Sequence, residues 1–150
     1  MTYKYSNNGF DEEARRIIAD IEFGSFRDPW NETVIKETAE SGYVSFLTAF
    51  TESEPVGFSC IQEVLGEAEI LRIAVRPEFR GMGMGRSILR ETLSYIMKRG
   101  NICVFLEVRE RNAAARNLYL SENFTEIAVR RNYYKNGENA VVMRLDINKK

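Results

Sequence analysis

The chain contains no histidine, and only two of its 150 residues are cysteine. The absence of histidine excludes Ser–His and Cys–His catalytic pairs and removes the ligand on which most zinc sites depend. Cys60 and Cys103 each lie in an apolar, strand-like run, so we expect reduced core thiols rather than a disulfide, a metal site or a nucleophile. Any general base must therefore be Glu, Asp, Lys, Tyr or Cys, and no metal is expected.

Long apolar runs and a strong net charge are also missing. No run approaches the roughly 18 apolar residues of a membrane span, and the first residues carry no signal-peptide pattern, so a cytoplasmic protein without membrane contact is expected. The formal net charge is −1, which gives no basic field for nucleic acid. The composition, with 44% hydrophobic and 29% charged residues, is typical of a globular protein, and we expect residues 1–150 to form a single domain.

The spacing of apolar residues predicts a mixed α/β (α+β) fold. The predicted strands cover 2–5, 43–50, 55–64, 67–75, 101–109, 124–131 and 140–147. The predicted helices cover 10–23, 31–42 and 112–120, and a further helix follows the glycine-rich loop and ends at Gly100. Asn31 is expected to cap the second helix, and Asn136-Gly137 to form a hairpin turn. The strand over 101–109 is largely apolar on both faces, which predicts a central strand covered on both sides. The order β-α-α-β-β-β-α-β-α-β-β indicates a mixed sheet with helices on its faces.

The most informative segment is the run Arg80-Gly81-Met82-Gly83-Met84-Gly85-Arg86, between a predicted strand and a predicted helix. Glycines at a helix N-terminus leave backbone N–H groups unshielded, and the helix dipole attracts anions there. This pattern predicts a phosphate-binding loop. Its spacing fits neither the G-x-G-x-x-G dinucleotide fingerprint nor the G-x-x-x-x-G-K-[ST] P-loop. The alternative interpretation is a glycine-rich turn with a solvated arginine.

A second group of candidates follows this run. Glu107 lies near the end of an apolar strand, where a carboxylate is costly unless it is paired, hydrogen-bonded or functional. The structural alternative is an ion pair with Arg109 or Arg72. Asn112 is a plausible cap for the next helix, and Tyr119 lies two turns along on the same face. For these two residues the alternatives are a structural cap and a core tyrosine.

Two motifs in these segments are similar to those of one known family. The R-x-x-G-x-G spacing of Arg80, Gly83 and Gly85 resembles the acyl-CoA pyrophosphate loop of the GNAT superfamily of N-acetyltransferases. The segment 106–119 resembles the L-E-V-R-x-x-N-x-x-A-x-x-L-Y motif of its RimI-like branch, the ribosomal-protein alanine N-acetyltransferases. Glycine at position 81, where this branch often has Arg or Gln, still fits the wider superfamily.

Further segments extend the likeness. Pro29-Trp30 and the residues 131–140 resemble the same branch, so the resemblance covers about residues 26–145. It implies a GNAT-type fold, in which a mixed, mostly antiparallel central sheet carries helices on both faces.

The resemblance also implies a reaction and its residues. The expected co-substrate is acetyl-CoA, and the expected reaction is direct attack of an amine on the acetyl group in a ternary complex. By resemblance, Glu107 takes the amine proton through a water, Tyr119 protonates the departing thiolate, and Trp30, Tyr133 and Tyr134 flank the acceptor. The cofactor-binding residues that it implies are Ile73, Ala74, Val75, Arg80, Gly81, Met82, Gly83, Met84, Gly85, Arg86 and Asn112. Tyr133 and Tyr134 are expected to alternate on a strand edge, where alternation alone predicts one core and one exposed tyrosine.

The expected acceptor is a protein or peptide N-terminus, in this branch that of a ribosomal protein. An α-amine with a pKa of about 7.7–8.0 is roughly a tenth neutral at pH 7, whereas a lysine amine with a pKa of about 10.4 is almost entirely charged, so a single carboxylate base suits the α-amine better. A lysine side chain or a small-molecule amine remains an alternative acceptor, and a catalytically silent acyl-CoA-binding module remains an alternative function. The charge at Arg72, near the expected acyl site, can alter acceptor preference. A monomer or a homodimer is expected.

Overall fold

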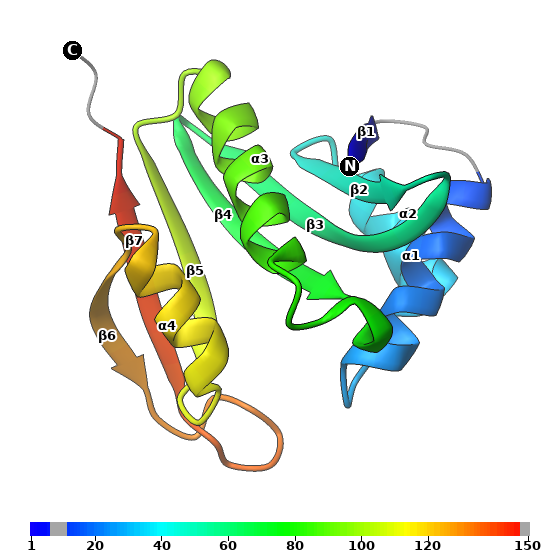
Figure 1. Cartoon of the computed structure of the whole chain (residues 1–150). Coiled ribbons are helices and arrows are strands. Elements are labelled where there is room, and N and C mark those ends of the chain that lie inside the picture. The colour runs from blue at the N-terminus through cyan, green and yellow to red at the C-terminus, as the bar shows by residue number, and fades with distance from the viewer. Residues whose placement is uncertain (7–11, 148–150) are drawn as a thin grey trace.

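The computed structural model describes residues 1–6 and 12–147, which form one seven-stranded sheet with helices on both faces (Figure 1). The strands are β1 (Thr2–Ser6), β2 (Val44–Thr51), β3 (Glu54–Val64), β4 (Glu67–Val75), β5 (Cys103–Arg109), β6 (Thr125–Arg130) and β7 (Ala140–Asp146). The helices are α1 (Glu12–Ser25), α2 (Glu32–Ala39), α3 (Met84–Lys98) and α4 (Ala113–Ser121), with a short 3₁₀ turn at Pro77–Phe79. The predicted order of strands and helices is confirmed. None of the described helices is long and apolar enough to cross a membrane.

The predicted asparagine caps at the starts of α2 and α4 are confirmed. The Asn31 side chain accepts a hydrogen bond from the Val34 N–H (2.9 Å) and caps α2, as expected. This helix ends at Ala39 rather than near Gly42, because Gly42 adopts a left-handed conformation (φ +86°) that cannot continue a helix. The predicted first helix began at Phe10, which lies outside the described residues; the described helix begins at Glu12.

The sheet has the order β1-β2-β3-β4-β5-β7-β6, and only β4 and β5 pair in parallel. The expectation of a mostly antiparallel sheet is therefore confirmed. The β4–β5 ladder runs from the pair Glu67–Cys103 to the pair Ile70–Leu106 and then stops. At the same point the register between β3 and β4 shifts, which leaves Leu71 as an extra residue in β4. A bulge of this kind bends its strand, and the two parallel strands diverge beyond it (Figure 1).

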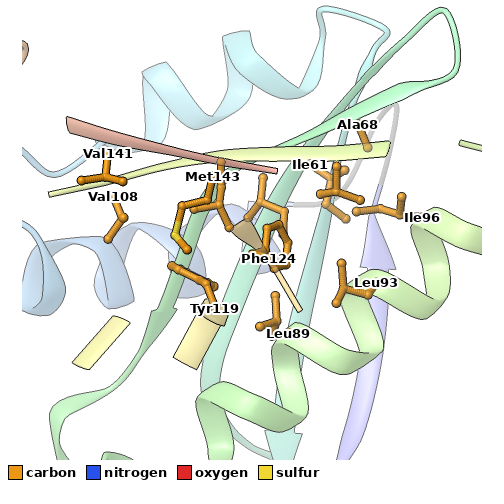
Figure 2. Packing of buried hydrophobic residues seen from close by; sticks show 13 residues of the cluster. Ile61, Ala68, Leu89, Leu93, Ile96, Val108, Tyr119, Phe124, Val141 and Met143 are labelled. Atoms are coloured by element: carbon orange, nitrogen blue, oxygen red, sulfur yellow. The ribbon is translucent and has the colours of Figure 1, made fainter. Parts of the chain in front are cut away.

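Two hydrophobic layers hold the helices against the sheet. On one face, Ile18 and Ile21 of α1 pack with α2 against Phe46 and Phe58. On the other face, α3 and α4 cover a second cluster, in which Tyr119 and Phe124 lie beside Met143 of β7 (Figure 2). Because both layers are anchored on the sheet, the divergent ends of β4 and β5 are fixed relative to the helices.

The prediction that β5 is a central strand covered on both sides holds at its start, where Cys103 and Val104 on opposite faces are both buried, and fails further along the strand. Its Val104, Leu106 and Val108 face the α3–α4 layer and are buried, whereas Phe105 and Glu107 on the other face are only half-buried. The described helices on that face, α1 and α2, pack mainly against β2, β3 and β4. The half-buried face of β5 is therefore available to a site.

The prediction that Tyr133 and Tyr134 alternate on a strand edge is also wrong. Strand β6 ends at Arg130, and both tyrosines lie in the loop 131–139. Asn132 ends the extended conformation because its φ is +51°. The predicted turn at Asn136-Gly137 is present within this loop, where the Gly137 N–H donates to the Tyr134 carbonyl (2.8 Å). Both tyrosines therefore take their positions from a folded loop rather than from strand alternation.

Candidate active site

A cavity of about 690 Å³ lies where β4 and β5 diverge. Its walls come from residues 69–73 of β4 and 106–109 of β5, with residues of the segments 25–30, 112–119 and 133–138 around them. Seven of the residues predicted for the site line this cavity: Trp30, Ile73, Glu107, Asn112, Tyr119, Tyr133 and Tyr134. The structure therefore brings the predicted catalytic pair and all three predicted acceptor residues around one space.

Glu107 projects from β5 into this cavity with an unusual set of contacts. Its Oε1 lies 3.8 Å from the Nε of Arg130, while its Oε2 is buried and has no hydrogen-bond partner among the described residues. The structural alternative, an ion pair with Arg109 or Arg72, is not formed, because Arg109 pairs with Glu138 (3.1 Å) and Arg72 pairs with Glu22 (3.3 Å). A buried carboxylate oxygen without a donor is costly and is suited to receive a proton or an N–H from a bound molecule.

Tyr119 lies on α4 across the cavity from the strands. Its ring packs edge-on against Phe124, with 5.8 Å between the ring centroids, and its side chain is buried in the α3–α4 layer. Burial raises the pKa of the Tyr119 phenol, and the neighbouring Tyr134 adds to the shift. Tyr119 is thus both a core tyrosine and a cavity residue, and its phenol stays protonated at neutral pH.

Asn112 both caps α4 and lines the cavity. Its side-chain oxygen accepts the N–H of Ala115 (3.1 Å) and caps α4, so the structural alternative for this residue holds. The same side chain lines the cavity, and its amide N–H₂ group is not used by the cap. A bound molecule can therefore be contacted by the amide without loss of the cap.

The two loop tyrosines are held by cations. Tyr134 lies under the guanidinium of Arg109 (3.9 Å to the ring centroid) and edge-on to Tyr133 (5.1 Å). The Glu107 carboxylate, burial and hydrogen bonding to Glu107 together raise the pKa of the Tyr133 phenol. Both rings are therefore neutral and form an aromatic wall next to the carboxylate.

Trp30 also lines the cavity. Its backbone N–H donates to the buried Oε1 of Glu22 (3.0 Å), and its ring lies 4.6 Å from the guanidinium carbon of Arg72. Trp30 is therefore fixed by contacts to α1 and to β4.

The glycine run lies outside the cavity lining, beyond the end of β4. Gly81 and Gly83 both have φ of +78°, and the first hydrogen bond of α3 is donated by the Ser87 N–H to the Gly83 carbonyl (3.1 Å). The N–H groups that precede this bond point out of the helix end, which is the arrangement of an anion site. The Arg80 Nε donates to the Val75 carbonyl (2.9 Å), and Arg86 donates to Ser121 and Glu122 at the C-terminal end of α4.

The remaining predicted cofactor residues lie on β4 beyond the bulge. Ala74 is buried in the α1–α2 layer, so only its backbone faces outward. One edge of this part of β4 pairs with β3, and the other has lost its partner because the β4–β5 ladder ends at Ile70. An unpaired strand edge offers N–H and C=O groups to an extended ligand. The open edge and the glycine run beside it fit the amide-containing arm and the pyrophosphate of a coenzyme A thioester.

Two charged residues of the site were missed by the sequence analysis. Glu69 of β4 lines the cavity, and Arg130 at the end of β6 reaches Glu107. Alternation along β4 alone does not relate Glu69 to β5, and only the register between the two strands shows that Glu69 and Glu107 share a face.

The chain matches the family model described as "Acetyltransferase (GNAT) family" over residues 12–124. Together with the open strand edge, the glycine run and the cavity lined by Glu107 and Tyr119, this match defines an acetyl-CoA-dependent N-acetyltransferase. The chain belongs to the GNAT family of acetyltransferases.

Individual relatives are more specific than the family model. The chain is 37% identical over 122 residues to the [ribosomal protein bS18]-alanine N-acetyltransferase of Escherichia coli (strain K12), covering 79% of this chain and 82% of that protein. It is also similar to the crystal structure of the ribosomal-protein-S18-alanine N-acetyltransferase from Escherichia coli, with a TM-score of 0.87 and 31% identity over 99% of this chain and 96% of that one. A PaiA N-acetyltransferase from Thermoplasma acidophilum, solved with coenzyme A, shares the fold with a TM-score of 0.78 and 17% identity, covering 98% of this chain and 100% of that one.

Proposed function

We propose that this chain, acting as a single acetyltransferase domain in the cytoplasm, acetylates the N-terminal α-amine of a protein, of the ribosomal-protein alanine type. The observation that carries this proposal is Glu107, which lines the same cavity as Tyr119 and whose buried Oε2 lacks a hydrogen-bond partner among the described residues. The relatives named for bS18 alanine acetylation support the choice of acceptor.

The donor would be held by the backbone. The unpaired edge of β4 at Ile73–Val75 binds the pantetheine arm as an added strand would, and Asn112 contacts the same arm from α4. The N–H groups of residues 81–86 and the Arg80 side chain bind the pyrophosphate. Acetyl-CoA supplies the activated acetyl group as a thioester.

The chemistry would be carried by two side chains. Glu107 takes a proton from the acceptor amine, either directly or through a water, because its Oε2 has no competing donor in the described structure. Tyr119 donates a hydrogen bond to the departing sulfur. Its raised pKa keeps the phenol protonated but makes full proton transfer to a thiolate, with a thiol pKa of about 8.5, unfavourable. Its contribution is therefore smaller than that of Glu107.

The acceptor would enter between two aromatic walls. Trp30 on one side and the Tyr133–Tyr134 pair on the other line the same cavity as Glu107. A chain terminus is narrow enough to pass between such walls, and its first side chain then lies against them. This arrangement supports a small first residue such as alanine.

A thiol-release assay tests the proposal. The purified chain is incubated with acetyl-CoA and peptides that differ only in the first residue. A matched peptide with a blocked N-terminus and an internal lysine serves as the control. We expect coenzyme A release with alanine-first peptides, and a mass increase of one acetyl group on the terminal residue. Acetylation of the lysine in the blocked peptide, or no release with any peptide, would contradict the α-amine assignment.

A further inference from the structure

Two carboxylates lie on the same face of the parallel strand pair that opens into the cavity. Glu69 of β4 is in register with Phe105 of β5, and Glu107 follows Phe105 by two positions. Since side chains alternate along a strand, Glu69 and Glu107 project from the same face of the sheet. Both line the cavity, so they form a diagonal pair across the last paired rung before the strands diverge.

The surrounding charges leave this pair with an excess of negative charge. Three of the four described cations that line the cavity already pair with other carboxylates: Arg72 with Glu22 at 3.3 Å, Arg109 with Glu138 at 3.1 Å, and Lys135 with Asp28 at 3.5 Å. The remaining lining cation, Arg27, comes from the segment between α1 and α2 rather than from the strands.

Arg130 is the cation nearest to the two carboxylates in the described contacts. Its Nε lies 3.8 Å from Oε1 of Glu107, and its side chain is more than half exposed. One partly solvated guanidinium at this distance does not neutralise two carboxylates, which leaves room for a second cation.

The electrostatic environment of Glu69 agrees with an excess of negative charge at the Glu69–Glu107 pair. Burial raises the pKa of its carboxyl, and repulsion by Glu107 raises it further, while Arg130 partly offsets the shift. A cation placed between Glu69 and Glu107 would relieve both effects.

We infer that Glu69 and Glu107 together receive the acceptor as its α-ammonium ion, with Glu69 as the residue that binds it and Glu107 as the residue that deprotonates it. This inference rests on the proposed function. At pH 7 roughly nine-tenths of an α-amine with a pKa near 8 carries a proton, so the charged form is the abundant one. Its three N–H donors require several acceptors, which a single carboxylate beside Arg130 does not supply.

The proton balance assigns one step to each carboxylate. Glu69 accepts a hydrogen bond from the ammonium and holds the nitrogen in place. Transfer of one ammonium proton to Glu107 frees the nitrogen lone pair. The new N–C bond then replaces the C–S bond of the thioester, and a second proton from nitrogen ends on the sulfur. Glu107 finally releases its proton to water.

Steady-state kinetics on three variants test this role. Glu69→Gln removes the charge with little change of shape, and Glu69→Asp retains it. Glu67→Gln is the matched control, because Glu67 lies on the same strand and the same face but is exposed and outside the cavity. At pH 7 we expect Glu69→Gln to raise the KM for an alanine-first peptide about tenfold, the size of one charge-assisted hydrogen bond. We expect kcat to change less than about threefold and the KM for acetyl-CoA to stay unchanged. Glu69→Asp recovers part of the loss, and Glu67→Gln behaves as the wild type.

The pH profile separates binding of an ammonium from a structural effect. Between about pH 7 and pH 9 the free acceptor becomes neutral, so the ratio of the Glu69→Gln to the wild-type KM should fall towards one. The groups around the pair are Glu107 on β5, Arg130 on β6 and Tyr133 in the following loop. Tyr133 keeps its proton in this range because its pKa is raised.

The outcomes distinguish the inference from the proposed function. If Glu69→Gln keeps the wild-type kcat and the wild-type KM for the peptide, the role of Glu69 is overturned but the proposed function is not. A loss of kcat at constant KM also overturns it, because Glu69 would then act in the chemical step. If the wild-type chain acetylates no peptide N-terminus, the proposed function fails and the inference fails with it.

Discussion

Arg72 on β4 and Glu22 on α1 form an ion pair on one face of the sheet, with 3.3 Å between Nε and Oε1. The Glu22 side chain is completely buried, whereas Arg72 keeps 23% of its side-chain exposure. The same Glu22 oxygen accepts the Trp30 N–H, and the guanidinium stacks on Phe26 and Trp30. One buried charge thus fixes the α1–α2 segment that forms a wall of the cavity.

Replacing Arg72 by methionine should destabilise the fold by about 3 kcal/mol, because it leaves an uncompensated buried carboxylate at Glu22. The double variant Arg72→Met/Glu22→Gln should recover most of this loss, since the glutamine oxygen still accepts the Trp30 N–H without a charge. Urea unfolding curves for the wild type and the variants measure both effects.

Arg76→Met provides the control for this prediction. Arg76 also joins the region after β4 to α1, through a 2.7 Å pair with Asp20, but Asp20 is 64% exposed and stays solvated when its partner is removed. Its guanidinium also donates to the Pro55 carbonyl. The expected loss is about 1 kcal/mol, so equal losses for Arg72→Met and Arg76→Met would show that burial of Glu22 does not control the effect.

The pH dependence of the unfolding free energy should reflect the titration of the Glu22 carboxyl. Burial raises the pKa of this carboxyl, although the Trp30 N–H and Arg72 oppose the shift. A carboxyl with a raised folded-state pKa stabilises the fold fully below the unfolded pKa of about 4.3, and this contribution is lost as the pH rises through the folded value. The wild-type free energy of unfolding, relative to that of Glu22→Gln, should therefore decrease from about pH 4 upward. A relative stability that increases with pH would contradict the raised pKa.

The sequence predicted those parts of the site that are set by local structure. Glu107, Asn112 and Tyr119 belong to one continuous strand–helix unit, so helical periodicity placed Asn112 and Tyr119 on one face, and the family motif over 106–119 linked them to Glu107. Glu69 was missed because its position relative to Glu107 depends on the register between two strands that are separated in the chain by α3. The bulge at Leu71 carries no glycine or proline to mark it, so the divergence of β4 and β5 was also unpredictable. Tyr133 and Tyr134 were misplaced because the β pattern does not show that Asn132 turns the chain.

Gly83→Ala should weaken the binding of acetyl-CoA. Gly83 caps α3 with φ of +78°, and no atom lies within 4 Å of an added Cβ, so the cost comes from the backbone conformation. We expect about 1–2 kcal/mol of destabilisation and a several-fold higher KM for acetyl-CoA, with the peptide KM unchanged. Gly66→Ala is the matched control, because Gly66 has φ of +82° and similar open space but lies at the opposite end of β4. It should lose similar stability and keep the wild-type KM; a raised KM in both variants would mean that the effect on acetyl-CoA is not local.

Tyr119→Phe should lower kcat by about tenfold while the fold is retained. The phenylalanine keeps the edge-on contact with Phe124 but loses the hydrogen bond to the leaving sulfur, and one such bond accounts for about one decade in rate. Because the pKa of Tyr119 is raised, its ionisation should not shape the wild-type pH profile up to about pH 9. Thiol release measured across this pH range gives both the kcat of Tyr119→Phe and the pH profile of the wild type. An unchanged kcat would show that Tyr119 serves only as a core residue.

Glu107→Gln should lower kcat by on the order of 10²-fold or more, because a glutamine cannot take the amine proton. The loss should be accompanied by little change in unfolding free energy, since Arg130 is more than half exposed and stays solvated without its partner. Turnover with an alanine-first peptide and urea unfolding measure the two effects separately.

Glu126→Gln is the control for Glu107→Gln, because it removes a carboxylate that pairs with Arg116 at 2.7 Å and does not line the cavity. Its kcat should equal that of the wild type. The pH profile gives the stronger test. If Glu107 is the base, the residual activity of Glu107→Gln should rise with pH as the peptide amine loses its proton to solvent, and the wild-type advantage should shrink above about pH 8. A constant deficit across pH, with an unfolding free energy reduced by several kcal/mol, would instead identify Glu107 as a structural residue.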